Sequence, residues 1–145
     1  MNENNIFYPD KDIIDVWINF LKSENNILKT KLPITDENWY LQVIDTIERI
    51  KMPYTVGIHM KTGHLLYYLD KNHNFLDGNK RTTIVIVYLF YFVNNYSVIS
   101  QNRLLVLVKD VAKSHGARQK DYWMAKIEKE LSYIVKSNEK IINKN

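Results

Sequence analysis

The sequence contains no cysteine, four glycines and three prolines among its 145 residues. Without cysteine there is no disulfide framework, no thiolate nucleophile and no cysteine ligand for zinc. This composition fits a reducing cytoplasm, which is where we expect the protein to reside. Because glycine and proline mark turns, their scarcity favours long helices over many short strands.

Long apolar runs are also absent, and no signal peptide is readable. The longest apolar run extends from Ile84 to Val93, well short of the ~20 residues that a membrane span requires. Residues 1–5 contain no basic stretch followed by an apolar one, so no signal peptide is expected. We therefore interpret the run as a buried core element and expect no membrane partner.

The remaining composition is that of a folded domain. Hydrophobic residues make up 46% of the chain, which is enough for a core, and the length predicts a single domain over residues 1–145 with an irregular arm at 1–9. The net charge is +4. The basic residues of the last third alternate with acids and form no basic stripe, so we expect no direct binding to nucleic acid.

Apolar residues recur at three- and four-residue spacing, which predicts amphipathic helices. Asp10, Thr35 or Asp36, and Ser100 are candidate N-caps. The loop between the first two helices, Lys29–Thr35, has an extended centre because Pro33 disfavours helical angles in the residue before it. The predicted helices span about residues 10–23, 35–52, 54–72, 79–94, 100–114 and 118–142.

The predicted fold class is all-α: a compact helical bundle around one central buried helix, with a short flap loop. The central helix is 79–94, which is apolar on all sides; its composition would also suit a buried strand, but its length favours a helix. Gly63 costs its helix about 1 kcal/mol relative to alanine, which suggests a close contact there. The last helix is predicted to turn these residues inward: Tyr122, Ile127, Leu131, Ile134 and Val135.

A dense polar stretch, residues 73–82, separates the third and fourth predicted helices. It reads His-Asn-Phe-Leu-Asp-Gly-Asn-Lys-Arg-Thr. The first turn of a helix has unpaired N–H groups and a positive dipole end, so a helix that starts at Asn79 can bind phosphate. Gly78 lets the chain turn its amide toward an anion. Lys80 and Arg81 add cations where a helix disfavours them, which suggests an anion between them.

The stretch also carries a base and a metal ligand. His73 titrates near neutral pH and can accept a proton from a hydroxyl. Asp77 is a hard oxygen ligand suited to magnesium. Each residue alone has an ordinary structural explanation, since Asp-Gly is common in turns and exposed cations are common on surfaces. The joint spacing is what favours a catalytic site.

This pattern resembles the central motif of the Fic/Doc proteins, His-x-Phe-x-Asp/Glu-Gly/Ala-Asn-Gly/Lys-Arg. The resemblance covers about residues 30–135. Typical Fic enzymes are AMP transferases with glycine after the asparagine and a second arginine further on, whereas this chain has Lys80 and Ile84 there. Both differences are similar to the Doc (death-on-curing) branch, whose toxins are kinases that use ATP to phosphorylate a threonine of translation elongation factor Tu.

The resemblance implies a role for each matching residue. His73 would be the general base toward the target hydroxyl, and Asp77 would coordinate Mg²⁺. The nucleotide phosphates would be held by the residues that follow, with Lys80 and Arg81 also acting in catalysis: Gly78, Asn79, Lys80, Arg81 and Thr82.

The resemblance also implies partners. The protein substrate would align along the flap, whose centre is Lys31, Leu32, Pro33 and Ile34. The self-inhibitory motif Ser/Thr-x-x-x-Glu-Gly/Asn does not occur, which implies a separate antitoxin of the Phd type docking in an apolar groove between the first helices. An AMP transferase on the same scaffold and a catalytically silent binding module remain alternatives.

Overall fold

The structure, a computed structural model, describes residues 5–23, 37–52, 55–71, 79–114 and 120–138. Two short strands, β1 (Tyr96–Val98) and β2 (Val135–Ser137), pair antiparallel with Ser97 opposite Lys136. The described residues are otherwise mainly helical, which confirms the all-α class. The helices are α1 (Lys11–Ser23), α3 (Glu37–Ile50), α4 (Ile58–Lys71), α5 (Asn79–Val93), α6 (Gln101–Lys113) and α7 (Lys120–Ile134).

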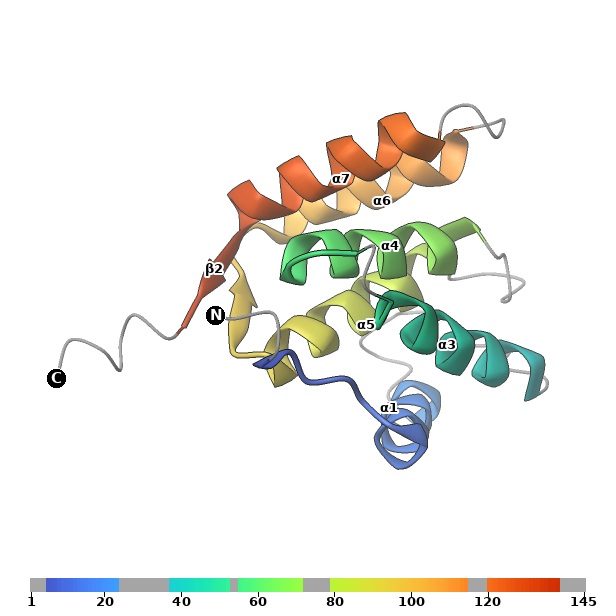
Figure 1. The fold of residues 1–145 in the computed structure, drawn as a ribbon. Helices are drawn as coiled ribbons and strands as arrows, with labels where there is room; N and C mark the ends of the chain where they lie inside the picture. Colours follow the sequence, from blue (N-terminus) through green and yellow to red (C-terminus); the bar gives the residue numbers. More distant parts are fainter. Residues whose placement is uncertain (1–4, 24–36, 53–54, 72–78, 115–119, 139–145) are drawn as a thin grey trace, which may run out of the picture.

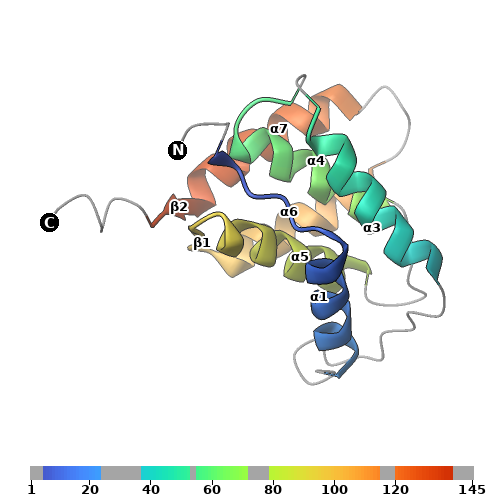
Figure 2. The same cartoon turned by 60° about the horizontal axis from the view of Figure 1, so that its bottom comes forward.

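The helices pack in layers around α4. α6 and α7 lie side by side, α4 runs along them, and α5 lies next to α4 on the side away from α7 (Figure 1). α3 contacts α4, and α1 contacts α3. Figure 2 shows α1 at the edge of the molecule, extending downward from near α5. The predicted central helix, α5, therefore shares the centre of the bundle with α4, which contacts α3, α5, α6 and α7.

Burial of α4 and α5 refines the predicted core. α5 buries one face completely, including Phe90 and Tyr91 at 0% exposure, but Phe92 is 74% exposed. The helix is therefore largely buried, as predicted, but not on all sides, because Phe92 reaches the surface. α4 is the more completely buried helix, although polar side chains on it conceal this in the sequence: Lys61, Thr62, His64 and Asp70 are all buried.

Predicted caps and one predicted close contact are confirmed. The carboxylate of Asp10 accepts a hydrogen bond from the N–H of Ile13 (3.0 Å). The hydroxyl oxygen of Ser100 accepts one from the N–H of Arg103 (3.3 Å). A Cβ added at Gly63 would lie 3.3 Å from Cγ2 of Ile127. Gly63 therefore lets α4 approach α7 closely, as its helix cost suggested.

The start predicted for α4, at Tyr54 or Thr55, is wrong. The helix begins at Ile58, after Gly57 at a φ of +84°, in the left-handed region. Thr55 instead caps the C-terminal end of α3: its hydroxyl lies 2.8 Å from the carbonyl oxygen of Ile50 and 2.9 Å from that of Met52.

The last predicted helix is also wrong in two respects. α7 ends at Ile134, because the next residues leave the helix to pair with β1 as β2. Tyr122, predicted to face inward, is 59% exposed. Trp123 packs against the core instead, since it lies one turn before Ile127 and so shares its face.

The N-terminal arm is tied to the end of α5. The side chain of Asn94 accepts a hydrogen bond from the N–H of Phe7 (2.6 Å) and donates one to the carbonyl of Phe7 (3.0 Å). The arm thereby gains a strand-like pair of bonds from a single side chain, and Ile6 joins the core.

Candidate active site

The polar stretch that the sequence singled out connects α4 to α5. α4 ends at Lys71 and α5 begins at Asn79, so the stretch spans the connection and the first turn of α5. The predicted base and metal ligand lie outside the described residues, as do Gly78 and the flap. The residues concerned are His73, Asp77, Gly78, Lys31, Leu32, Pro33 and Ile34.

The structure places the remaining predicted site residues, Asn79–Thr82, in the first turn of α5. Their backbone is described and their side chains are not. This turn contains no acidic residue, so no carboxylate of its own turn competes for the positive end of the helix dipole. A helix therefore starts where the sequence predicted phosphate binding, and phosphate binding at a helix start uses the backbone N–H groups of its first turn.

Near the end of α4, which leads into the stretch, cations from two other helices contact one tyrosine ring. Cζ of Arg49, from the end of α3, lies 4.7 Å from the ring centroid of Tyr68. Nζ of Lys120, from the start of α7, lies 5.1 Å from the same centroid. A hydrogen bond from Lys120 to the Tyr68 side chain raises the pKa of the lysine ammonium. Tyr67 packs edge-on against Tyr68, with 5.7 Å between ring centroids.

A second link joins this end of α4 to α6. Nζ of Lys71 donates a hydrogen bond to the carbonyl of Ser114, just after α6. In Figure 1 the end of α4, the start of α5, the end of α6 and the start of α7 lie at the same end of the molecule. Asp70, in the last turn of α4, is 0% exposed. The candidate site thus begins where several helix ends meet.

Sequence reasoning missed these neighbours of the site. Arg49 and Lys120 are far apart in sequence and look like ordinary surface cations, so no spacing pattern could join them. Asp70 carried a weak signal, as the acid that directly follows the apolar and aromatic run from Leu65 to Leu69.

The two described histidines, His59 and His64, both make hydrogen bonds within the helical bundle. Nδ1 of His64 donates to the carbonyl of Met60 (2.9 Å), and Nδ1 of His59 lies 2.8 Å from the hydroxyl of Tyr91. Burial lowers the pKa of both imidazoles, and burial raises the pKa of Tyr91. His59 lies at the opposite end of α4 from the polar stretch, so the His59–Tyr91 pair is a separate packing feature.

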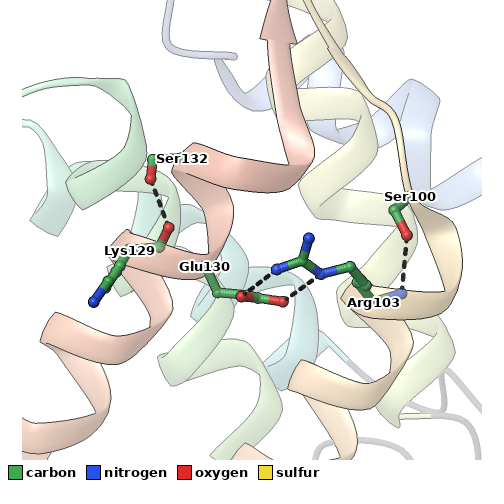
Figure 3. Close-up of polar contacts among 5 residues, drawn as sticks. All are labelled: Ser100, Arg103, Lys129, Glu130 and Ser132. Carbon is green, nitrogen blue, oxygen red and sulfur yellow. Dashed lines mark hydrogen bonds and ion pairs between the residues drawn. The ribbon is translucent and has the colours of Figure 1, made fainter.

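A groove between α6 and α7 has a volume of about 380 Å³ and is lined by Asn102, Arg103, Val106, Leu107, Asp110, Lys126 and Glu130. Nε and Nη2 of Arg103 each donate to the carboxylate of Glu130 at 2.9 Å (Figure 3). This bond raises the pKa of Arg103. The described residues that line the groove all lie on α6 and α7.

Within the described residues, no group of three or more His, Asp or Glu could hold a metal ion. No helix in the described ranges is long and apolar enough to cross a membrane.

The helical fold and the polar stretch that leads into α5 can be compared with known protein families. The model of the Fic/DOC family matches residues 37–91, which contain α3, α4, the polar stretch and most of α5. This match supports the resemblance seen in the motif. Searches of curated proteins and of solved structures gave no significant match.

Proposed function

We propose that the chain is a Doc-like toxin kinase that transfers the γ-phosphate of ATP to a threonine hydroxyl of a translation elongation factor such as elongation factor Tu. The observation that carries the proposal is the motif at 73–82 ending in the first turn of a buried helix. The family match over 37–91 supports the transferase class, and the kinase reaction rests on Lys80.

The reaction needs one proton transfer and one phosphoryl transfer. His73 accepts the proton of the target hydroxyl, and the hydroxyl oxygen attacks the γ-phosphorus. The bond from that phosphorus to its bridging oxygen breaks, and ADP leaves. Lys80, Arg81 and the N–H groups of the α5 start stabilise the charge on the phosphoryl oxygens, which is the main task of a protein in phosphoryl transfer.

Magnesium fits the residues present. Asp77 supplies a carboxylate next to the phosphate-binding turn, and magnesium is commonly held by one or two carboxylates together with phosphate oxygens. When bound, the ion would neutralise part of the phosphate charge.

Lys80 favours phosphoryl over AMP transfer. Its side chain stands where typical Fic enzymes have glycine, and it would fill the space that a departing pyrophosphate needs. The runner-up, AMP transfer, shares the same base and the same phosphate-binding turn, but the hydroxyl would attack the α-phosphorus and release pyrophosphate.

A separate antitoxin of the Phd type would restrain the toxin, because the sequence lacks the self-inhibitory motif. We expect it to dock between the first helices. Val16 on α1 is 65% exposed and Leu41 on α3 is 54% exposed, and these two helices contact each other. Exposed apolar side chains on adjoining helices are suited to an amphipathic partner helix.

The test uses ATP labelled on either the α- or the γ-phosphate, incubated with magnesium and a cell lysate. Label from the γ-phosphate alone should enter protein, and His73→Ala should abolish it without unfolding the chain. Label from the α-phosphate would replace the kinase by an AMP transferase. No transfer of either label by folded protein would instead favour a binding module.

Lys80→Gly tests the origin of the specificity. The variant should lose at least about tenfold of γ-transfer, because one charge-assisted phosphate contact is removed, and it should gain measurable α-transfer. Lys109→Gly, on the exposed face of α6, is the matched control, since it carries a similar helix cost of about 1 kcal/mol far from the motif in sequence. Equal rates of γ-phosphate transfer in the two variants would show that Lys80 has no role in the reaction.

A further inference from the structure

The contacts at the end of α4 form a set that we call the Tyr68 clamp, comprising Arg49, Tyr68, Lys71, Ser114 and Lys120. The ring centroid of Tyr68 lies 4.7 Å from Cζ of Arg49 on α3 and 5.1 Å from Nζ of Lys120 on α7. Lys71 donates to the carbonyl of Ser114. The last turn of α4 is therefore held from α3, from the end of α6 and from the start of α7.

We propose that the Tyr68 clamp positions the catalytic stretch that follows α4, with Lys120 and Tyr68 as positioning residues for the transfer reaction. The inference rests on the proposed function for the reaction that is positioned. It adds a role for the C-terminal helices, since Ser114 and Lys120 lie outside the matched residues 37–91.

The geometry of the clamp suits positioning better than bulk stability. Arg49 has 45% of its side chain exposed, and Lys120 is exposed as well, so neither contact is a core contact. What these contacts restrict is the direction of the last turn of α4, because they approach one ring from α3 and α7. A planar guanidinium and an ammonium on an aromatic ring fix that ring relative to both helices.

The charges of the clamp also support a positioning role. Arg49 and Lys120 repel each other, and this repulsion opposes the rise in the pKa of Lys120 that Tyr68 causes. Bringing two cations together at one side chain costs free energy unless the ring and its hydroxyl hold both. Asp45 offsets part of the charge, since it lies 3.6 Å from Arg49.

The position of the clamp in the chain gives it leverage on the chemistry. Tyr68 lies in the last turn before Lys71, after which the chain enters the stretch that contains His73. A displacement of about 1 Å at a reacting group can cost on the order of 100-fold in rate. A freed end of α4 should thus lower turnover while leaving the fold intact.

The test compares Lys120→Met, Lys120→Arg and Tyr68→Phe with Lys129→Met, which removes an exposed lysine from the same helix. Turnover, KM for ATP and the thermal midpoint are measured for each. Lys120→Met should lower kcat at least about tenfold, with KM and the midpoint close to those of Lys129→Met. Lys120→Arg should restore kcat, and Tyr68→Phe should fall between them because it keeps the ring and loses the hydroxyl.

A kcat for Lys120→Met equal to that of Lys129→Met would overturn the inference, as would a loss that follows the thermal midpoint and is not restored by Lys120→Arg. If the wild-type protein transfers nothing, the proposed function fails, and hydrogen exchange still tests the clamp. Amides of the last turn of α4 should then exchange faster in Lys120→Met than in Lys129→Met. Equal exchange would show that Lys120 does not hold the turn.

Discussion

Lys61 is 1% exposed, and its ammonium donates hydrogen bonds to the carbonyl of Ile50 (2.6 Å) and the hydroxyl of Thr55 (2.8 Å). Its Nζ also lies 5.7 Å from the ring centroid of Tyr8. A buried lysine is tolerated only where its charge is met by acceptors. Here the acceptors lie at the end of α3. The Lys61 side chain of α4 therefore caps the C-terminus of α3 and also contacts Tyr8 of the N-terminal arm.

Lys61→Met should therefore destabilise the protein although it keeps the apolar stem. The loss of hydrogen bonds from a charged donor, with a buried carbonyl left behind, costs roughly 1.5–3 kcal/mol. Urea unfolding gives the change in the free energy of unfolding. The control, Lys129→Met, should change it by less than about 0.5 kcal/mol, and equal values for the two variants would contradict the assigned role of Lys61.

Single residues mark the limit of what the sequence could predict. Helical spacing correctly identified core residues such as Ile127, Leu131 and Ile134, because burial of an apolar stripe repeats along one element. It could not identify Lys61 or Tyr68 as structural centres. Their partners come from other helices, and no local pattern records which cation will meet which ring.

At the scale of elements, α4 depends on its approach to α7. A Cβ at Gly63 would meet Cγ2 of Ile127 at 3.3 Å and the backbone nitrogen of Glu128 at 3.8 Å. A side chain larger than hydrogen thus has to push either a core residue or a helix backbone. The small residue here sets the separation of the two helices.

Gly63→Val should destabilise the protein by about 1–3 kcal/mol, the usual cost of overpacking a core. Ile127→Ala alone should also destabilise it, by leaving a cavity. The double variant should lose less than the sum of the two, because the added methyl groups enter the space that Ile127 vacates. Strict additivity in urea unfolding would show that the two side chains do not meet.

The element boundaries show which physical information the sequence lacked. Caps at Asp10 and Ser100 were predictable, since an N-cap bonds to residues three positions along the same chain. The end of α7 was not, because Val135 leaves the helix to pair with Val98, a partner distant in sequence. Next to the candidate site, the sequence predicted a helix that starts at Asn79 or Lys80, and α5 does begin at Asn79.

At the scale of the whole molecule, α4 separates two polar regions. One end leads into the proposed transfer site, and the other carries the His59–Tyr91 pair, with Tyr96 packed against both rings at 6.0 Å. Between them His64 is 8% exposed. Because α4 contacts most of the other helices, protonation of its histidines acts on the stability of the entire fold.

The direction of this pH dependence follows from the two lowered values. Burial lowers the pKa of His59 and His64 below their usual 6.5; for His64, Lys120 and Lys61 act in the same direction, while Met60 and Glu128 oppose. The unfolded chain then binds protons more readily than the folded one. Stability from these groups is fully present above pH 6.5 and is lost as pH falls through the folded values.

Urea unfolding at a series of pH values from 7.5 to 5 should thus give a falling free energy of unfolding. The slope contributed by each histidine is at most roughly 1.4 kcal/mol per pH unit. In the double variant His59→Gln, His64→Gln the curve should be flatter, because neither glutamine can bind a proton in the unfolded chain. The thermal midpoint at pH 7.5 shows whether the double variant is folded. Parallel curves for the two proteins would assign the pH dependence to groups other than these two imidazoles, and the interior of α4 would then have no part in it.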